Sequence, residues 1–189
     1  MSICADFELI AGFYGPEESE QLYNHFLQDH YWPENRYQFA GRQFVLPRLQ
    51  TWHADAGIRY SYSNNLLETR PWTPVLSEIR TKVETFLGFA FNSVLVNRYR
   101  HGDDHVGWHA DNEPELGEQP FIASVSFGAA RRFEFKHKKT AQQDGMVLSQ
   151  GSLLIMRPDF QHYWLHRVPV DRDVVDSRIN LTFRKVVMV

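Results

Sequence analysis

The chain contains little cysteine, no long apolar run and no excess of positive charge. Cys4 is the one cysteine among 189 residues, which excludes an intramolecular disulfide and a zinc site built on several cysteines. No stretch is apolar for long enough to cross a membrane, and the N-terminus lacks the pattern of a signal peptide. The net charge of −3 excludes a protein covered in positive charge, although it leaves room for a basic patch. We therefore expect no membrane partner and a cytoplasmic location, or a nuclear one in a eukaryote.

Two helices are predicted in the N-terminal half. Pro16 is followed by two acidic residues, which is typical of a helix start, and this helix should run to about residue 28. A second helix should begin near Pro74 and stop at Gly88. Its apolar residues recur at spacings of three and four, which predicts one buried face. These residues are Val75, Ile79, Val83 and Phe86.

From residue 91 onward the pattern changes to short runs rich in Val, Ile, Phe and Tyr, separated by turn residues. Many strands without intervening helices predict an antiparallel double sheet, a jelly roll, with the N-terminal helices packed on one sheet. We expect a mainly β protein with some α, organised as a single domain over 1–189. Residues 1–90 would hold the helices and a lid, and 91–189 the jelly-roll core. We expect a monomer.

Three His-x-Asp triplets are candidate metal ligands. In an extended chain, side chains two residues apart point the same way, so each triplet could grip one metal. A third ligand would come from His162 or His166. Two histidines and one carboxylate form the ligand set of non-haem Fe(II) oxygenases, which leaves open positions for co-substrate and oxygen. A surface loop that happens to contain His and Asp is the alternative for any one triplet. The triplets are His53-Asp55, His101-Asp103 and His109-Asp111.

The segment SRINLTFRKV alternates polar and apolar residues. Arg178, Asn180, Thr182 and Arg184 would share one face of a strand, and the apolar residues between them the other. Two arginines on one face need an anion or solvent. A solvated edge strand is one interpretation, and a buried dicarboxylate is the other, because guanidinium matches carboxylate in a fork.

Several linked segments together resemble the AlkB family of DNA-dealkylating dioxygenases. They are NRYRHGDDHVGWHADNEPELG, IASVSFGAARRFEF, GSLLIM, HRVP and SRINLTFRKV, and the similarity covers about residues 37–186. The resemblance implies that His109, Asp111 and His166 bind Fe(II), because His166 directly precedes Arg167-Val168-Pro169. The other His-x-Asp residues and His162 would then be surface or loop residues.

The resemblance also implies a 2-oxoglutarate site. Arg178 would pair with the distal carboxylate, and Arg184 would meet the end that chelates iron. Asn97, Tyr99, Asn180 and Thr182 would complete the slot. With O2 as oxidant, the alkyl carbon of a damaged base would be hydroxylated and released as an aldehyde, while 2-oxoglutarate becomes succinate and carbon dioxide.

The substrate implied by the resemblance is an alkylated base such as 1-methyladenine or 3-methylcytosine in DNA, and RNA is a second candidate. A paired base must be flipped or already unpaired to reach such a site. Tyr62 would stack on it from the lid, Tyr60 would make a neighbouring polar contact, Glu113 would read the base edge and Arg48 would contact base or backbone. Ordinary strand packing is the alternative for both tyrosines.

The resemblance also bears on strand preference. A duplex-acting member of the family carries an aromatic residue at the tip of a hairpin that matches QFAGRQF, where this chain has Ala40. A methyl group cannot fill the space left by a flipped base, and the neighbouring Phe39 should leave the opposite face of the strand. We therefore expect a preference for single-stranded DNA, with Phe39 as the substitute wedge if the turn re-aims it.

Two other functions are consistent with parts of the pattern. A related oxygenase could act on RNA or on a protein side chain, and a jelly-roll module could bind a ligand without catalysis. The intact ligand set and both arginines argue against the second. The tract RRFEFKHKK carries six basic residues, and Arg98 and Arg100 flank the site strand. These side chains could hold phosphates or could lie on a solvated face.

Overall fold

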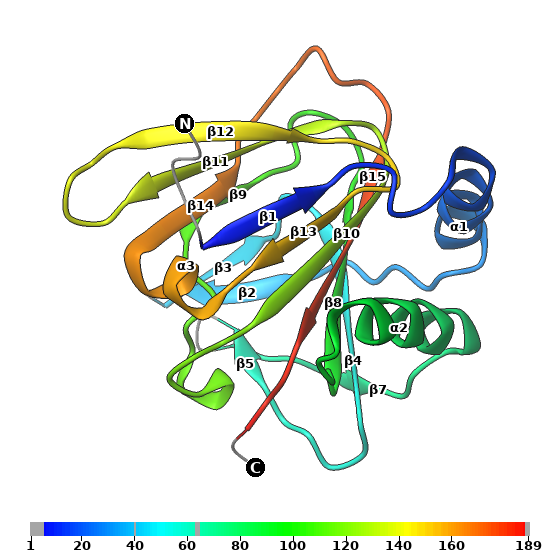
Figure 1. Ribbon diagram of the computed structural model, residues 1–189, viewed down its shortest axis with the longest axis horizontal. Helices are drawn as coiled ribbons and strands as arrows, with labels where there is room; N and C mark the ends of the chain where they lie inside the picture. Colours follow the sequence, from blue (N-terminus) through cyan, green and yellow to red (C-terminus); the bar gives the residue numbers. More distant parts are fainter. Residues whose placement is uncertain (1–5, 40, 63–64, 188–189) are drawn as a thin grey trace.

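The computed structural model describes residues 6–39, 41–62 and 65–187, except for the side chains of Phe39 and Tyr62. Two β-sheets face each other, and two helices, α1 (Pro16–Gln28) and α2 (Pro74–Leu87), lie beyond the larger sheet (Figure 1). Two short helices lie in the connections: η1 (Pro114–Leu116) and α3 (Pro158–Tyr163). This arrangement confirms the mainly β jelly roll with its N-terminal helices on one sheet.

The larger sheet has seven strands and the smaller one four. In spatial order the larger sheet contains β1 (Phe7–Ile10), β13 (Leu153–Met156), β10 (Ile122–Gly128), β15 (Arg178–Arg184), β8 (Ser93–Tyr99), β4 (Leu49–Ala54) and β7 (Thr69–Arg70). The smaller contains β12 (Gln143–Leu148), β11 (Arg131–His137), β14 (Trp164–Val168) and β9 (Val106–His109). Within these sheets the described pairings are antiparallel, apart from the parallel pair β4 and β7.

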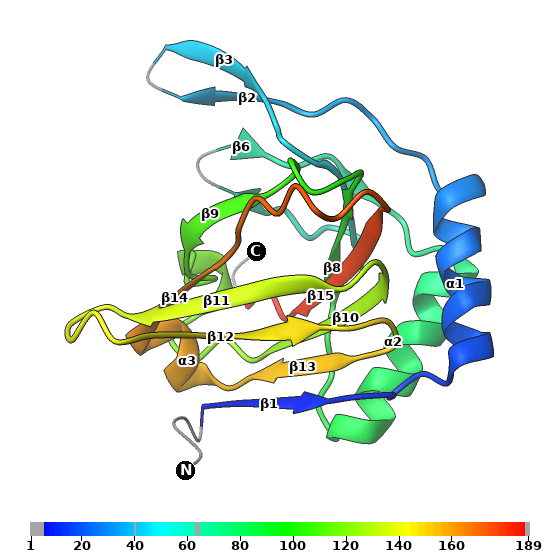
Figure 2. The same cartoon turned by 90° about the horizontal axis from the view of Figure 1, so that it is seen from above.

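Two small hairpins complete the fold. One joins β2 (Arg36–Phe39) to β3 (Arg42–Val45) and extends away from the sandwich (Figure 2). The other joins β5 (Ser61–Tyr62) to β6 (Asn65–Leu66). The turn expected at residues 40–41 thus separates β2 from β3, although Ala40 itself lies outside the described residues.

Both long helices begin at the predicted proline, and α2 ends at the predicted glycine. In α2, the hydroxyl of Thr73 accepts a hydrogen bond from the backbone N–H of Leu76 at 3.2 Å, and Gly88 ends the helix with a φ of 63°. The buried face is centred on Leu76, Ile79 and Val83. The prediction that Phe86 belongs to it is wrong: Phe86 falls at the edge of this face and is 52% exposed.

The core has two main layers that share β15. The outer layer lies between the helices and the larger sheet, and Ile179, Leu181 and Phe183 face it. The inner layer fills the sandwich with residues such as Phe133 and Trp164. Since β15 lies between β10 and β8, its polar face points into the sandwich and is buried, which excludes the solvated edge strand.

The expectation that no helix interrupts the later strands is wrong at two places, because η1 lies between β9 and β10 and α3 between β13 and β14. Pro158 starts α3 between β13 and β14, where six residues form a helix instead of an extended connection. Phe160 anchors it in the inner core and is fully buried. A helix this short has too few turns for a periodic apolar pattern, so the sequence gives no signal for it.

Candidate metal centre and anion pocket

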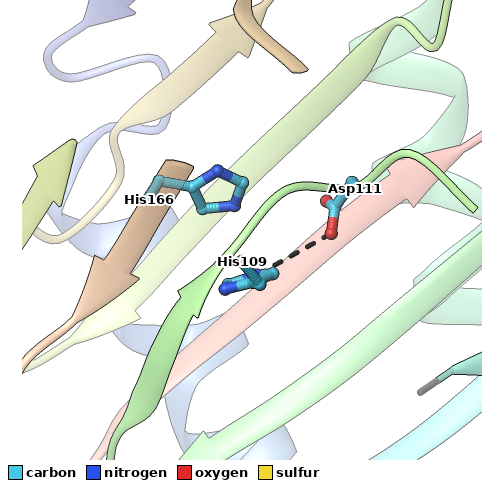
Figure 3. A group of neighbouring side chains, drawn as sticks. All are labelled: His109, Asp111 and His166. Atoms are coloured by element: carbon cyan, nitrogen blue, oxygen red, sulfur yellow. Dashed lines mark ion pairs between the residues drawn. The ribbon is translucent and has the colours of Figure 1, made fainter. Parts of the chain in front are cut away.

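Three predicted metal ligands come together inside the sandwich. His109 ends β9, Asp111 follows two residues later, and His166 is the cross-strand partner of His109 on β14. One ligand atom from each lies within 4.8 Å of the others. His109 Nε2 is 3.8 Å from Asp111 Oδ1, and the three side chains converge (Figure 3). Two imidazoles and one carboxylate in this arrangement suit a divalent iron with open positions for other ligands.

Hydrogen bonds hold the ligands in a metal-binding state. The His109 Nδ1–H donates to the carbonyl of Gly107 at 2.8 Å, so that Nε2 carries the lone pair. Asp111 Oδ2 accepts a hydrogen bond from Arg184 at 2.8 Å. Asp111 Oδ1 and His166 Nδ1 are buried without a hydrogen-bond partner among the described residues. A cation bound between these side chains would satisfy the unpaired carboxylate oxygen, so the residues present fit a metal ion.

The electrostatics of the cluster also suit metal binding. Burial alone would raise the pKa of Asp111, but Arg184 and the two histidines lower it to about 2. Burial lowers the pKa of His109, and it lowers that of His166 to about 3. The carboxylate is therefore ionised and both imidazoles are neutral near pH 7, which are the protonation states that bind a metal.

A pocket extends from the triad into the space between the two sheets. Arg178 lies in it, is only 1% exposed and donates a hydrogen bond to Ser126 Oγ at 2.9 Å. Its Nε and Nη1 have no partner among the described residues. Burial lowers the pKa of Arg178 to about 10, which leaves it charged near pH 7. A buried guanidinium with two unfilled donors is strongly destabilising unless an anion binds there.

The predicted co-substrate residues all line this pocket, where they make internal contacts as well. Asn180 donates to Ser124 Oγ at 2.7 Å and accepts from the Thr182 hydroxyl at 3.0 Å. Arg48 also lines the pocket, and its Nε donates a hydrogen bond to Asn97 Oδ1 at 3.1 Å. The residues named from the sequence that line the pocket are Arg48, Asn97, Tyr99, His109, Asp111, His166, Arg178, Asn180, Thr182 and Arg184.

Three residues that support the site were not predicted from the sequence. Ser124 and Ser126 orient Asn180 and Arg178, and the alternation in IASVSFG could have revealed them, since both serines share the face opposite Val125. Gln161 is fully buried, and its Oε1 accepts the backbone N–H of Asp111 at 2.8 Å. It lies on α3, the helix that the sequence did not predict.

The remaining His-x-Asp residues lie away from the triad. Asp55, His101, Asp103 and His162 are exposed, as expected. The prediction for His53 is wrong, because this residue is buried on β4 and its Nδ1–H donates to the carbonyl of Pro71 at 2.7 Å. Its imidazole contacts the connection that leads into α2. A His-x-Asp motif alone cannot show whether its histidine is buried in this way or lies in a surface loop.

Two predicted base-binding residues lie beside the metal centre. Tyr60 is 1% exposed and stacks on Trp52, with ring centroids 4.6 Å apart. Burial raises the pKa of Tyr60; the charge of Arg184 opposes this shift, and the charges of Glu113 and Asp111 add to it. Burial, aided by the charge of Asp111, also raises the pKa of Glu113. The side chains of Tyr62 and Phe39 lie outside the described residues.

Comparisons with known proteins agree with this geometry. The 2OG-Fe(II) oxygenase superfamily matches residues 6–184. Mouse DNA oxidative demethylase ALKBH2 is 43% identical over 157 residues, which are 79% of this chain and 66% of that protein. Human alpha-ketoglutarate-dependent dioxygenase alkB homolog 3 is 37% identical over 188 residues, 94% of this chain and 65% of that protein. The chain thus spans slightly less than two thirds of the length of these curated relatives.

A solved structure, that of OsALKBH1, matches 98% of this chain and all of that chain with a TM-score of 0.68. At 15% sequence identity it supports the fold alone. No helix of the described residues is long and apolar enough to cross a membrane. The resemblance to the AlkB family is confirmed, and Fe(II), 2-oxoglutarate and O2 are the cofactor and co-substrates that the wider family implies. The chain belongs to the 2OG-Fe(II) oxygenase superfamily.

Proposed function

We propose that this protein oxidatively removes alkyl groups from bases such as 1-methyladenine and 3-methylcytosine in DNA, and so reverses alkylation damage directly. One observation carries the proposal: a His-Asp-His triad and a buried arginine, two of whose donors have no partner among the described residues, face the same internal pocket. A metal and a dicarboxylate are the ligands that satisfy both. The name of the mouse relative, DNA oxidative demethylase, supports a DNA base as substrate.

Each group in the pocket has a distinct task under this proposal. His109, Asp111 and His166 would hold Fe(II), and Arg178 would bind the distal carboxylate of 2-oxoglutarate. Arg184 holds Asp111 Oδ2 at 2.8 Å and would also meet the end of 2-oxoglutarate nearest the metal. When bound, Fe(II) with 2-oxoglutarate and O2 would supply the oxidising power that hydroxylates the alkyl carbon.

The base would enter on the side of Tyr60 and Glu113. Because the pKa of Glu113 is raised, its carboxyl can hold a proton near the base more readily than an ordinary glutamate. Tyr62 would stack on the base, and Phe39 would contact the strand from the hairpin. Arg48 is only 4% exposed and bonded to Asn97, so contact with the co-substrate end of the pocket suits it better than contact with the nucleic-acid backbone.

A repair assay tests the proposal. Oligonucleotides that carry 1-methyladenine or 3-methylcytosine, in single- and double-stranded DNA and in RNA, should lose the methyl group only when Fe(II), 2-oxoglutarate and O2 are present. Formaldehyde and succinate should appear in equal amounts. Uncoupled succinate formation without demethylation of any oligonucleotide would favour the alternative, an oxygenase acting on a protein side chain. Faster repair of RNA than of DNA would favour the RNA enzyme.

The proposal includes a preference for single-stranded DNA, a monomer, and a location where DNA is found, the cytoplasm or the nucleus of a eukaryote. Ala40 supports the strand preference, because alanine is too small to fill the space of a flipped base. Ala40→Phe should narrow the difference in rate between single- and double-stranded DNA. Equal wild-type rates, with a loss confined to duplex DNA in Phe39→Ala, would identify Phe39 as the wedge.

A further inference from the structure

In the described part of the chain, no helix covers the outer face of the four-stranded sheet. Both α1 and α2 pack on the other sheet, so the larger sheet stands between them and the smaller one (Figures 1 and 2). On the smaller sheet, His109, Phe133 and His166 point into the sandwich. Because side chains alternate along a strand, Trp108, Arg132, Glu134, Lys136 and Arg167 point outward.

Trp108 lies at the centre of a cationic cluster on this face. The Lys136 ammonium and the Arg167 guanidinium each lie 4.5 Å from the centroid of its ring. Glu134 binds Arg167 at 2.7 Å and Arg132 at 3.1 Å, so it holds both guanidinium groups on the sheet surface. The face therefore carries three positive charges against one carboxylate, on a chain whose net charge is −3.

The basic residues of the RRFEFKHKK tract differ in their contacts: some are bonded within the protein, and others face solvent. Arg131 is 1% exposed and donates hydrogen bonds to backbone carbonyls such as that of Pro169, at 2.7 Å. Lys138 donates to the carbonyl of Gln161 at 2.8 Å. Arg131 therefore stabilises loops, and Lys138 is held against α3. Lys136 has no carboxylate partner among the described residues, so its charge is available to an external anion.

The position of this face relates it to the metal centre. Trp108 directly precedes the metal ligand His109 on β9, the edge strand of the sheet. Strands β14 and β11 follow β9 in the sheet, so at a spacing of about 4.8 Å per strand the cationic cluster extends from that edge to about 10 Å across the face. A polynucleotide with one base at the metal could therefore place the phosphates of adjacent nucleotides on this face.

We infer that Trp108, Arg132, Lys136 and Arg167 form a basic platform that binds the phosphates of the strand flanking the target nucleotide. This inference rests on the proposed function. Phosphate contacts position a nucleic acid without reading its sequence, so the platform would increase affinity for any strand long enough to reach it. Trp108 supports the platform by keeping the stems of Lys136 and Arg167 in place.

Binding of single-stranded 15-mers carrying 1-methyladenine tests the platform, with the enzyme loaded with Fe(II) and 2-oxoglutarate in the absence of oxygen. Anisotropy is measured at several salt concentrations for wild type, Lys136→Met and Lys136→Arg. Lys82→Met is the matched control, since Lys82 also lies over an aromatic ring, that of Tyr14 at 3.8 Å, but on the helix side. Lys136→Met keeps an apolar stem over Trp108 and removes one charge.

We expect Lys136→Met to reduce the slope of log affinity against log salt by about 0.7, the contribution of one phosphate contact in a single strand. Lys136→Arg and Lys82→Met should keep the wild-type slope. Demethylation of a 15-mer should suffer more in Lys136→Met than demethylation of a trinucleotide. The platform is refuted, and the proposed function survives, if the wild type demethylates the 15-mer and the trinucleotide but Lys136→Met and Lys82→Met have the same slope of log affinity against log salt. If the wild type demethylates no oligonucleotide, both fail.

Discussion

Replacing Arg178 with Met should raise the apparent KM for 2-oxoglutarate steeply while metal binding survives. Arg178 donates a hydrogen bond to Ser126, and its buried Nε and Nη1 have no hydrogen-bond partner among the described residues, so its geometry suits a fork against a carboxylate. Leaving a buried carboxylate unpaired costs about 2–5 kcal/mol. The charge of Arg131 also acts on this site, which retains part of the attraction and places the loss in the lower half of that range. The KM should rise roughly 30- to 300-fold, because each 1.4 kcal/mol is a factor of ten.

The same substitution should stabilise the protein when no 2-oxoglutarate is present. A buried charge without a partner destabilises the fold, and Met fills much of the same volume without that cost. The melting temperature of Arg178→Met should therefore exceed that of wild type without 2-oxoglutarate, and the order should reverse at saturating 2-oxoglutarate. Ser126→Ala is the control, because it removes the internal hydrogen bond and keeps the charge. An unchanged KM in a folded Arg178→Met would refute the assignment of Arg178 to the distal carboxylate.

Five further substitutions test the site and the protein around it. Turnover should be abolished in His166→Ala but largely kept in His162→Ala, since His162 is exposed on α3; the opposite result would exchange the ligand assignment. Gln161→Leu should weaken Co(II) binding to the metal-free protein, measured by titration, because Asp111 loses the acceptor of its backbone N–H; unchanged affinity would make Gln161 a packing residue. Glu113→Ala should lower demethylation more than uncoupled succinate formation, whereas equal losses would assign Glu113 to the support of the metal. Burial lowers the pKa of His30 from 6.5 to about 4. The free energy of unfolding should therefore decrease as the pH drops from about 6.5 towards 4. In urea titrations, His30→Gln should show a smaller decrease over the same pH range than wild type.

The sequence predicts the helices well because their ends depend on local chemistry. Pro16 and Pro74 start α1 and α2 at the expected residues, and Gly88 ends α2 in the left-handed conformation. The face of α2 is less well predicted, because Val75 and Phe86 match the helical period nearly as well as Leu76 does. Which of them is buried depends on the position of the sheet, and no local pattern contains that information.

The site shows a similar division between local and tertiary information. Alternation along β15 correctly separates Arg178 and Arg184 from Phe183, but the same pattern fits an edge strand in water as well as a central strand. The tertiary fold decides between the two, because β10 and β8 flank β15 on both sides. His53 and His109 stand in the same His-x-Asp motif, but only His109 lies at the metal centre, whereas His53 is hydrogen-bonded to the carbonyl of Pro71. The local motif therefore does not identify the metal ligand.

The two arginines of β15 are in different states, and this difference suggests how the pocket fills. Arg184 already has Asp111 as partner at 2.8 Å, so the metal side of the pocket is organised by groups of the protein itself. Arg178 has two buried donors without a hydrogen-bond partner in the described part of the chain, so an anion that binds at the far end of the pocket should stabilise the protein most. The hydrophobic packing of Ile179 and Phe183 beneath the helices stabilises β15 on its other face and offsets the cost of burying that charge. A strand stabilised on one face can thus hold an unpaired charge on the other, and binding of the dicarboxylate should increase the stability of the whole sheet.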